Sequence, residues 1–392
     1  MNTQTESVQN KGLSGAVWGL AIIPLILLGV VVALIVVADG GLTILAGPPV
    51  EQVTIQRIRL PEPGVIEVTV VNDGPESVTI PQVLVDEAYW NFTAEPSTTI
   101  PRFGSATYTI TYPWVEEETH EVTLITSLGA TFSEEIAVAV ESPQMSGRLF
   151  AQFGLVGIYV GIVPVVLGML WYPFMRRLGQ QAMNFILALT VGLLIFLAVG
   201  TWLDAQEFAQ ELPAFWQGVP LVVFVALLTL GVLLAISGGD GETSSLGLSY
   251  RIATGIGLHN LGEGLAIGAA FALGEAALGT FLILGFTIHN ITEGVGIAAP
   301  IVRKNPGLQH FAYLALIAGG PAIIGTWVGG FAFNPLLATV FLAIGIGAIL
   351  QVVWEVGKLV SRNSDRLTNW VNLAGVTAGI AVMYVTAFLV KF

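Results

Sequence analysis

The hydrophobic pattern of this 392-residue chain changes character twice, and the first part of the chain is an isolated apolar run. Residues 1–14 are mostly polar, whereas about 16–38 contain no charged residue. That run matches the roughly 20 residues that a helix needs to cross a bilayer. Because the apolar core of a signal peptide is shorter, about 7–15 residues, we predict an uncleaved membrane anchor.

Residues 45–145 alternate between apolar and polar positions and are rich in β-branched residues. The clearest stretches are 65–71 and 106–111, and the Asn-Asp-Gly-Pro sequence at 72–75 is a turn signal. Several short strands over about 100 residues predict an immunoglobulin-like β-sandwich. His120 follows a run of glutamates, and we expect it on a surface loop rather than among metal ligands.

The pattern changes again after residue 150, where long apolar segments follow one another. They predict eight transmembrane helices near 151–174, 182–203, 217–237, 248–272, 277–300, 308–332, 335–358 and 369–390. The fold class is therefore an α-helical polytopic membrane protein with an all-β domain. We divide it into a tail and anchor at 1–44, the β-domain at 45–147 and a helical domain at 148–392.

Composition supports a membrane protein and excludes several classes of function. Hydrophobic residues make up 54% of the chain and charged residues only 10%, whereas soluble proteins carry about 25%. Without a cysteine, any metal site must use imidazole, carboxylate or amide ligands. Residues 39–149 hold 16 acidic and 4 basic residues, which argues against nucleic acid as a partner.

The basic residues predict the orientation of the chain, because short cytoplasmic loops are enriched in Lys and Arg. With a cytoplasmic N-terminus, the cytoplasmic side collects nine of the fourteen: Lys11, Arg176, Arg177, Arg251, Arg303, Lys304, Lys358, Arg362 and Arg366. The β-domain then lies outside the cytoplasm. We expect a multi-pass protein of the cell membrane.

Two adjacent predicted spans contain a repeated polar motif. One reads His259-Asn260-Leu-Gly-Glu263-Gly, and the next reads His289-Asn290-Ile-Thr-Glu293-Gly. Ionisable groups in the bilayer core cost about 2.5–3.5 kcal/mol on insertion scales, so they indicate function. A histidine and a glutamate four residues apart lie on one helix face, about 6 Å apart along the axis.

Because a short loop joins the two spans, the spans run antiparallel and can present two imidazoles and two carboxylates to one point. This ligand set suits zinc, and also iron(II), cobalt or manganese. Asn260 and Asn290 can add carbonyl oxygens. The competing explanation is that these side chains only join helices by hydrogen bonds. We favour a metal site because the motif is duplicated.

The two motifs resemble the metal-binding fourth and fifth helices of the ZIP (Zrt-, Irt-like protein) family of divalent metal transporters, over about 150–392. The family patterns are similar to His-Asn-x-Pro-Glu-Gly and His-x-x-Pro-Glu-Gly. Here Gly262 and Thr292 replace the motif prolines, and position 290 is not acidic. A sixth-helix Glu-Pro appears as Gly320-Pro321.

The resemblance implies a ZIP-like eight-helix carrier that moves a divalent metal ion, with zinc favoured, into the cytoplasm by alternating access. His259, Glu263, His289 and Glu293 correspond to the primary ligands, and the missing acids imply one metal site rather than two. Glu207, His310 and Glu355 are further candidates for the ion path, or are residues at helix ends.

We expect the metal ion and the lipid bilayer as partners and no prosthetic group. A homodimer and the partner of the β-domain are left open. We predict no catalytic residue, because the chain lacks the common hydrolase motifs. Two alternatives are a membrane-bound metal-dependent enzyme and a surface receptor or adhesion protein that works through the β-domain.

Overall fold

A computed structural model of the chain describes residues 22, 24, 26–33, 50–237, 244–273, 276–363 and 369–390. The chain divides into two compact units, residues 1–50 and residues 51–392. In the first unit, the described residues of the predicted anchor are helical and exposed. The remainder of the predicted tail and anchor lies outside the described residues.

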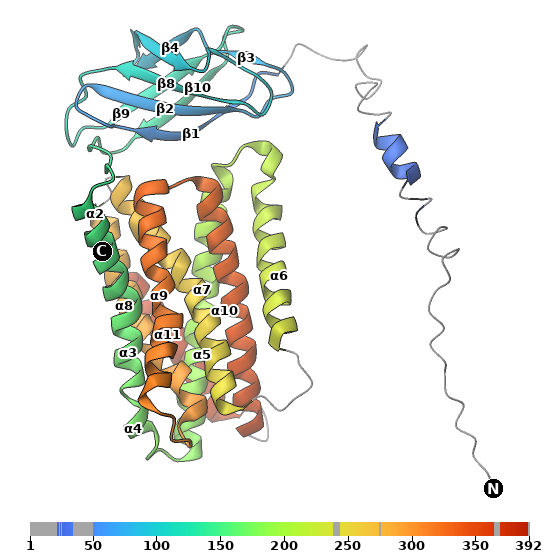
Figure 1. Cartoon of the computed structure of the whole chain (residues 1–392), viewed down its shortest axis with the longest axis vertical. Helices are drawn as coiled ribbons and strands as arrows, with labels where there is room; N and C mark the ends of the chain where they lie inside the picture. The colour runs from blue at the N-terminus through green and yellow to red at the C-terminus, as the bar shows by residue number, and fades with distance from the viewer. Residues whose placement is uncertain are drawn as a thin grey trace. The chain divides into compact units, whose positions relative to one another are not determined.

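The second unit begins with the β-rich domain, whose strands form two four-stranded antiparallel sheets and one small two-stranded sheet (Figure 1). The first sheet has the order β1-β2-β8-β6 and the second β10-β9-β4-β5, while β3 pairs with β7. The strands are β1 (Val53–Arg59), β2 (Val65–Asn72), β3 (Val78–Thr79), β4 (Gln82–Val85), β5 (Ala88–Trp90), β6 (Phe92–Glu95), β7 (Thr99–Ile100), β8 (Ser105–Thr111), β9 (His120–Ile125) and β10 (Thr131–Ile136).

The two strands that the sequence predicted most clearly are confirmed as β2 and β8, which pair with each other. Ile66 lies opposite Ile110, and Val68 lies opposite Tyr108. All four side chains are fully buried. Residues between them in the sequence, such as Glu67, face the other side of the sheet, which is the two-residue period of a half-buried strand.

The expectation that His120 lies on a surface loop is wrong. His120 is the first residue of β9, and only 4% of its surface is exposed. Its Nδ1 and the hydroxyl of Tyr112 both lie within hydrogen-bond distance of Asp86 Oδ2, at 2.7 and 2.6 Å, while the backbone N–H of Glu121 donates to Asp86 Oδ1 at 2.9 Å. Asp86 therefore joins three donors from two neighbouring segments.

The rest of the unit is helical (Figure 1). Its longer helices are α2 (Gly147–Gly157), α3 (Val163–Met169), α5 (Gln180–Gln210), α6 (Gly218–Ser237), α7 (Ser245–Ala272), α8 (Ala276–Ala298), α9 (Leu308–Ala332), α10 (Pro335–Asn363) and α11 (Trp370–Val390). Shorter helical pieces are the π-helical turn η2 (Ile158–Ile162), which joins α2 to α3, then α4 (Tyr172–Met175), η3 (Ala214–Trp216) and η4 (Ala299–Ile301).

Each of the eight predicted spans corresponds to a helix, the first one interrupted by η2. Six helical segments in the described part of the chain are long and apolar enough to cross a membrane: 147–175, 180–210, 214–237, 278–301, 308–332 and 335–362. α7 is not among them, because its polar motif lowers its hydropathy, and the apolar part of α11 is shorter. The described chain is thus a helical membrane protein with a β-rich domain.

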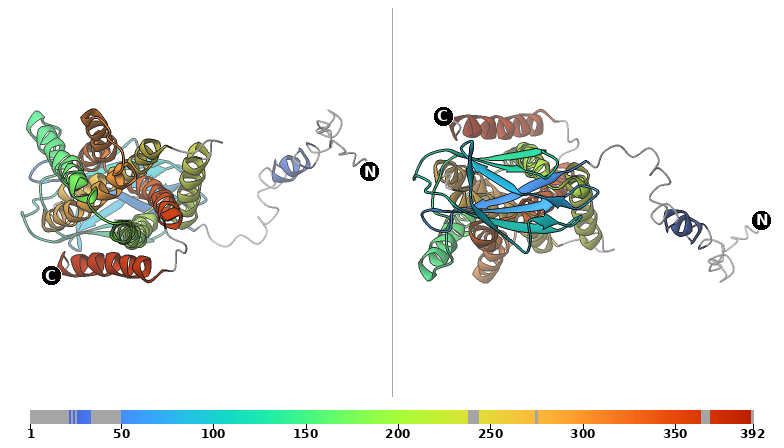
Figure 2. Two further views of the ribbon diagram at one scale, coloured as in Figure 1. Left: turned by 90° about the horizontal axis from the view of Figure 1, so that it is seen from below. Right: turned by 90° about the horizontal axis from the view of Figure 1, so that it is seen from above.

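Burial separates the central helices from the peripheral ones. In its most apolar window α10 is 61% buried, whereas α6 is only 11% buried and exposes leucine and phenylalanine side chains. Figure 2 shows most of the helices end-on and α11 side-on. α7 and α9 approach each other closely at several glycines; for example, a Cβ at Gly264 would lie 2.2 Å from the carbonyl oxygen of Ala322. This close backbone packing fixes the position of the helix that carries the first motif.

We predict that Asp86→Ala destabilises the β-domain by about 1–3 kcal/mol, because it leaves Tyr112, His120 and the N–H of Glu121 without their acceptor. Glu87→Ala is the matched control, since both residues have positive φ (49° and 65°) and Glu87 is exposed. The measurement is hydrogen exchange of the β9 amides in the full chain. Equal loss of protection in both variants would contradict the role assigned to Asp86.

The same network predicts how β-domain stability depends on pH. Burial alone raises the pKa of Asp86, but hydrogen bonds from Tyr112, Glu121 and His120 outweigh it and lower that pKa below its ordinary value. The stabilisation is therefore present above about pH 4 and is lost as the pH falls through the lowered pKa. We expect β9 protection, corrected for intrinsic exchange, to decline in acid, and Asp86→Asn to flatten this decline.

Candidate metal centre

The two motifs meet in the interior of the helical bundle. α7 provides His259, Asn260 and Glu263, and α8 provides the second set, His289, Asn290 and Glu293. All six residues are at most 5% exposed. The imidazole rings of the two histidines lie with their centroids 6.5 Å apart. The four-residue spacing places each histidine and glutamate on the same face of its helix, and these two faces are turned toward each other.

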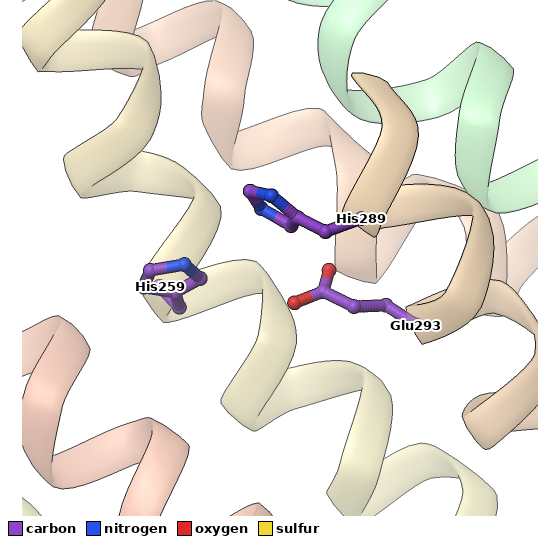
Figure 3. A group of neighbouring side chains, drawn as sticks. All are labelled: His259, His289 and Glu293. Carbon is purple, nitrogen blue, oxygen red and sulfur yellow. The ribbon is translucent and has the colours of Figure 1, made fainter. Parts of the chain in front are cut away.

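Three of these side chains are arranged as a metal-ligand set. One ligand atom each from His259, His289 and Glu293 lie within 4.8 Å of one another. Figure 3 shows the side chains reaching from α7 and α8 into the space between these helices. Ligand atoms around a tetrahedral zinc ion are roughly 3.3 Å apart, given bonds of about 2.0–2.1 Å. A closure of about 1–1.5 Å would bring the three atoms to that separation.

Glu263 is bonded differently from Glu293. Its Oε1 accepts hydrogen bonds from the Nε2 atoms of His259 and His289, at 2.8 and 2.5 Å. Its Oε2 accepts from the side-chain amide of Asn290 at 3.2 Å. Because an ionised carboxylate can only accept, both imidazoles donate through Nε2 in this arrangement. The second nitrogen of His259, Nδ1, is then a lone-pair donor to a metal.

Several acceptor atoms at this point have no hydrogen-bond partner in the described part of the chain. They are His259 Nδ1, Asn260 Oδ1, Asn290 Oδ1 and both carboxylate oxygens of Glu293. Leaving a buried acceptor unpaired costs about 1–3 kcal/mol, and more if it is charged. Five such atoms around the same motifs form a concentration of lone pairs, which is the environment that a cation would satisfy.

The side-chain amides of the two asparagines donate to backbone carbonyls of other helices. Asn260 Nδ2 donates to the carbonyl oxygen of Ala318 in α9 at 2.9 Å. Asn290 Nδ2 donates to that of Val160 in η2 at 3.1 Å. These contacts identify the nitrogen of each amide group, because a carbonyl cannot accept from the amide oxygen. The Oδ1 atoms of Asn260 and Asn290 therefore lie on the side of each amide group that points away from the carbonyl to which it donates.

The further candidates for the ion path do not join this cluster. His310 Nδ1 lies 2.9 Å from the hydroxyl of Tyr250. Glu355 forms ion pairs with Lys358 at 3.2 Å and with Arg251 at 4.0 Å. Glu207 lies near the end of α5. The interior of α9 carries Gly320 and Pro321 where the resembling family has Glu-Pro, so α9 adds no carboxylate.

Sequence reasoning did not identify the backbone of η2 and α9 as part of the site. The signal was present, since each region lies shortly before a proline within an apolar span. A proline lacks an N–H group, so it leaves a carbonyl one turn earlier without its helical partner.

Comparisons with known proteins add no assignment: no protein-family model matches the chain, and no curated protein matches it.

The unequal bonding of the two glutamates predicts opposite effects on stability in metal-free protein. Glu263→Gln weakens hydrogen bonds from three donors, and we expect a loss of about 1.5–3 kcal/mol. Glu293→Gln removes an unpaired buried carboxylate, so stability should stay the same or rise. The measurement is thermal and denaturant unfolding of each variant in detergent with a chelator present. Equal destabilisation by both changes would show that the two carboxylates are equivalent.

Proposed function

We propose that this chain is a membrane carrier for a divalent transition metal ion, with zinc as the favoured cargo. The observation that carries the proposal is the buried cluster of His259, His289 and Glu293 beside Glu263. In the described part of the chain, several buried acceptor atoms around this cluster receive no hydrogen bond. Such a cluster within an apolar bundle is costly unless a cation compensates it. Imidazole nitrogens and carboxylate oxygens are ligands that zinc, iron(II), cobalt and manganese share.

The resemblance to the ZIP family supports the same function. In this proposal α7 and α8 correspond to the fourth and fifth helices of the family, and the helices from α2 to α11 form a ZIP-like transport domain. A single cargo ion binds at a time, because position 290 is Asn and Gly320 stands in place of an acid. The β-domain belongs to the proposal as an immunoglobulin-like module outside the cytoplasm.

In the proposed mechanism, the ion exchanges its water shell for the histidine and glutamate ligands near the bilayer midplane. Glu293, whose two oxygens lie without a hydrogen-bond partner of good geometry in the described part of the chain, binds the ion first. Glu263 then exchanges its hydrogen bonds with the two histidines for a bond to the ion. Each imidazole binds as a neutral ligand through the ring nitrogen that carries no proton, which is Nδ1 as long as Nε2 keeps its hydrogen. Rocking of helix groups around the site releases the ion into the cytoplasm.

A cavity of about 10 Å³, close to the smallest volume that holds one water molecule, lies on one side of the cluster. It lies between α5, α8 and α11, and His289 and Glu293 form part of its wall together with Thr190, Thr292 and Met383. The hydroxyls of both threonines donate to carbonyls of their own helices. Among the residues that line the cavity, His289 and Glu293 therefore offer the strongest ligands for a transition metal ion.

The experiment that tests the proposal is uptake of zinc, iron(II), manganese and cobalt by liposomes that contain the purified chain. We expect uptake of at least one metal above protein-free liposomes, with saturation. The Glu263→Gln/Glu293→Gln double variant should lose at least about 90% of this uptake. Changes in residues that only orient metal ligands already weaken metal sites by about 10–100-fold, and these two residues are direct ligands.

The control variant is Glu141→Gln, which makes the same chemical change at an exposed position of the β-domain. It should transport like the unmodified chain. Metal binding without uptake by either protein would reject a carrier and favour a metal-dependent enzyme or sensor. Uptake that persists in the double variant would show that the ion crosses elsewhere. Full uptake after deletion of 45–145 would exclude a function carried by the β-domain alone.

A further inference from the structure

Two prolines lie inside helices next to the candidate metal centre. Pro164 is the second residue of α3, and Pro321 lies in the interior of α9. In α-helical register, each missing N–H would pair with the carbonyl four residues earlier, that of Val160 or of Ile317. The turn η2 itself bonds in π register, with the N–H of Val163 donating to the carbonyl of Ile158. No water is present in the hydrocarbon region, so these carbonyls and their neighbours need donors from the protein.

The motif asparagines donate to backbone carbonyls close to both prolines. Asn290 donates to the carbonyl of Val160, four residues before Pro164. Asn260 donates to the carbonyl of Ala318, which directly follows Ile317. The carbonyl of Ile317 itself is packed against Gly257 of α7, where a Cβ would lie only 2.1 Å from the oxygen. Each motif helix is thus bonded to a segment of another helix that lies three or four residues before a proline.

These two segments contact each other. Gly161 follows Val160, and Gly319 follows Ala318. A Cβ at Gly161 would lie 2.3 Å from the carbonyl oxygen of Gly319, and a Cβ at Gly319 would lie 2.6 Å from the carbonyl carbon of Gly161. Distances below 3.0 Å leave no space for a side chain against backbone. Both anchoring carbonyls therefore belong to one glycine-to-glycine contact, which we name the Gly161–Gly319 junction.

We infer that the Gly161–Gly319 junction positions the ligands of the metal centre through Asn260 and Asn290. The junction sets where the two carbonyls lie, and the carbonyls set the orientation of the two amides. Asn290 transmits this position to Glu263, whose Oε2 accepts from the same amide nitrogen at 3.2 Å. Glu263 in turn accepts from both histidines. The consequence for cargo binding rests on the proposed function, whereas the positioning of the histidines does not.

Two adjacent glycines allow a matched test. Gly319→Ala forces α9 away from η2, whereas a Cβ at Gly320 meets nothing within 4 Å. Both substitutions add one methyl group to the same helix. Gly347→Ala provides a packing control at a different contact, because its Cβ would lie 2.4 Å from the carbonyl oxygen of Ala226 in α6. It should lower stability without altering the metal centre.

The first readout is the side-chain NMR spectrum of histidine-labelled full-length protein in detergent without metal. The chain has four histidines. His120 in the β-domain and His310, which contacts Tyr250, serve as internal references. We expect Gly319→Ala to shift the signals of His259 and His289 and to leave the two references unchanged. Gly320→Ala and Gly347→Ala should give the spectrum of the unmodified chain.

The second readout is binding of Co²⁺, followed by its visible absorption, and of Zn²⁺ by competition. Changes in residues that orient metal ligands typically weaken binding by about 10–100-fold. We expect a loss in that range for Gly319→Ala, with a changed cobalt spectrum, and less than about a threefold change for the two control variants. If the unmodified chain binds neither metal but the histidine signals still shift, the proposed function fails and the positioning stands.

Unchanged signals of His259 and His289 in folded Gly319→Ala would overturn the inference, whatever the metal binding. If Gly319→Ala does not fold, Asn290→Ala replaces it, combined with Glu263→Gln in a double-mutant cycle read by the same histidine signals. We expect Asn290→Ala to shift both histidine signals in the unmodified background and to add little once Glu263 is changed. Equal additional shifts in both backgrounds would overturn the inference.

Discussion

The helical part of this structure depends on one constraint, the absence of water to pair with polar groups inside a membrane-spanning bundle. Each backbone or side-chain group must find its partner within the protein. Helices meet most of this requirement, and Pro164 and Pro321 each remove one N–H group close to the candidate centre. The side-chain amides of Asn290 and Asn260 donate at these two places. The motif asparagines therefore have a structural requirement to satisfy that is independent of any ion.

The same constraint gives meaning to the groups that are not paired. Two described basic side chains lie on helices close to the cluster, Arg251 on α7 and Lys358 on α10. Both form an ion pair with Glu355. The donors around the cluster are used by Glu263 and by backbone carbonyls. What remains within the described residues is a set of acceptors, including both oxygens of Glu293. A protein that folds around surplus acceptors is suited to an external cation, because further packing cannot supply the missing donors.

The sequence predicted those features that depend on spacing, and it failed for those that depend on which helices meet. Alternation identified β2 and β8, and apolar length identified the helices. The alternation of polar and apolar residues could also have placed His120 correctly, because His120, Val122 and Leu124 all lie on the buried face of β9. By contrast, the repeat made Glu263 and Glu293 equivalent, whereas only Glu263 accepts from both histidines. This difference arises from distances between helices, which no local pattern encodes.

The bonds around the candidate centre also define which helices belong with it. The described hydrogen bonds of its asparagines, histidines and Glu263 run within α7 and α8, to η2 between α2 and α3, and to α9. α10 approaches through Gly345, where a Cβ would lie 3.4 Å from His259 Nδ1, which is ordinary contact without a hydrogen bond. A rearrangement that preserves these polar bonds must therefore carry α2, α3, α7, α8 and α9 together. Movement relative to α10 leaves these bonds intact, but it breaks the ion pair between Arg251 of α7 and Glu355 of α10, while the apolar contacts beside it are non-directional and can slide.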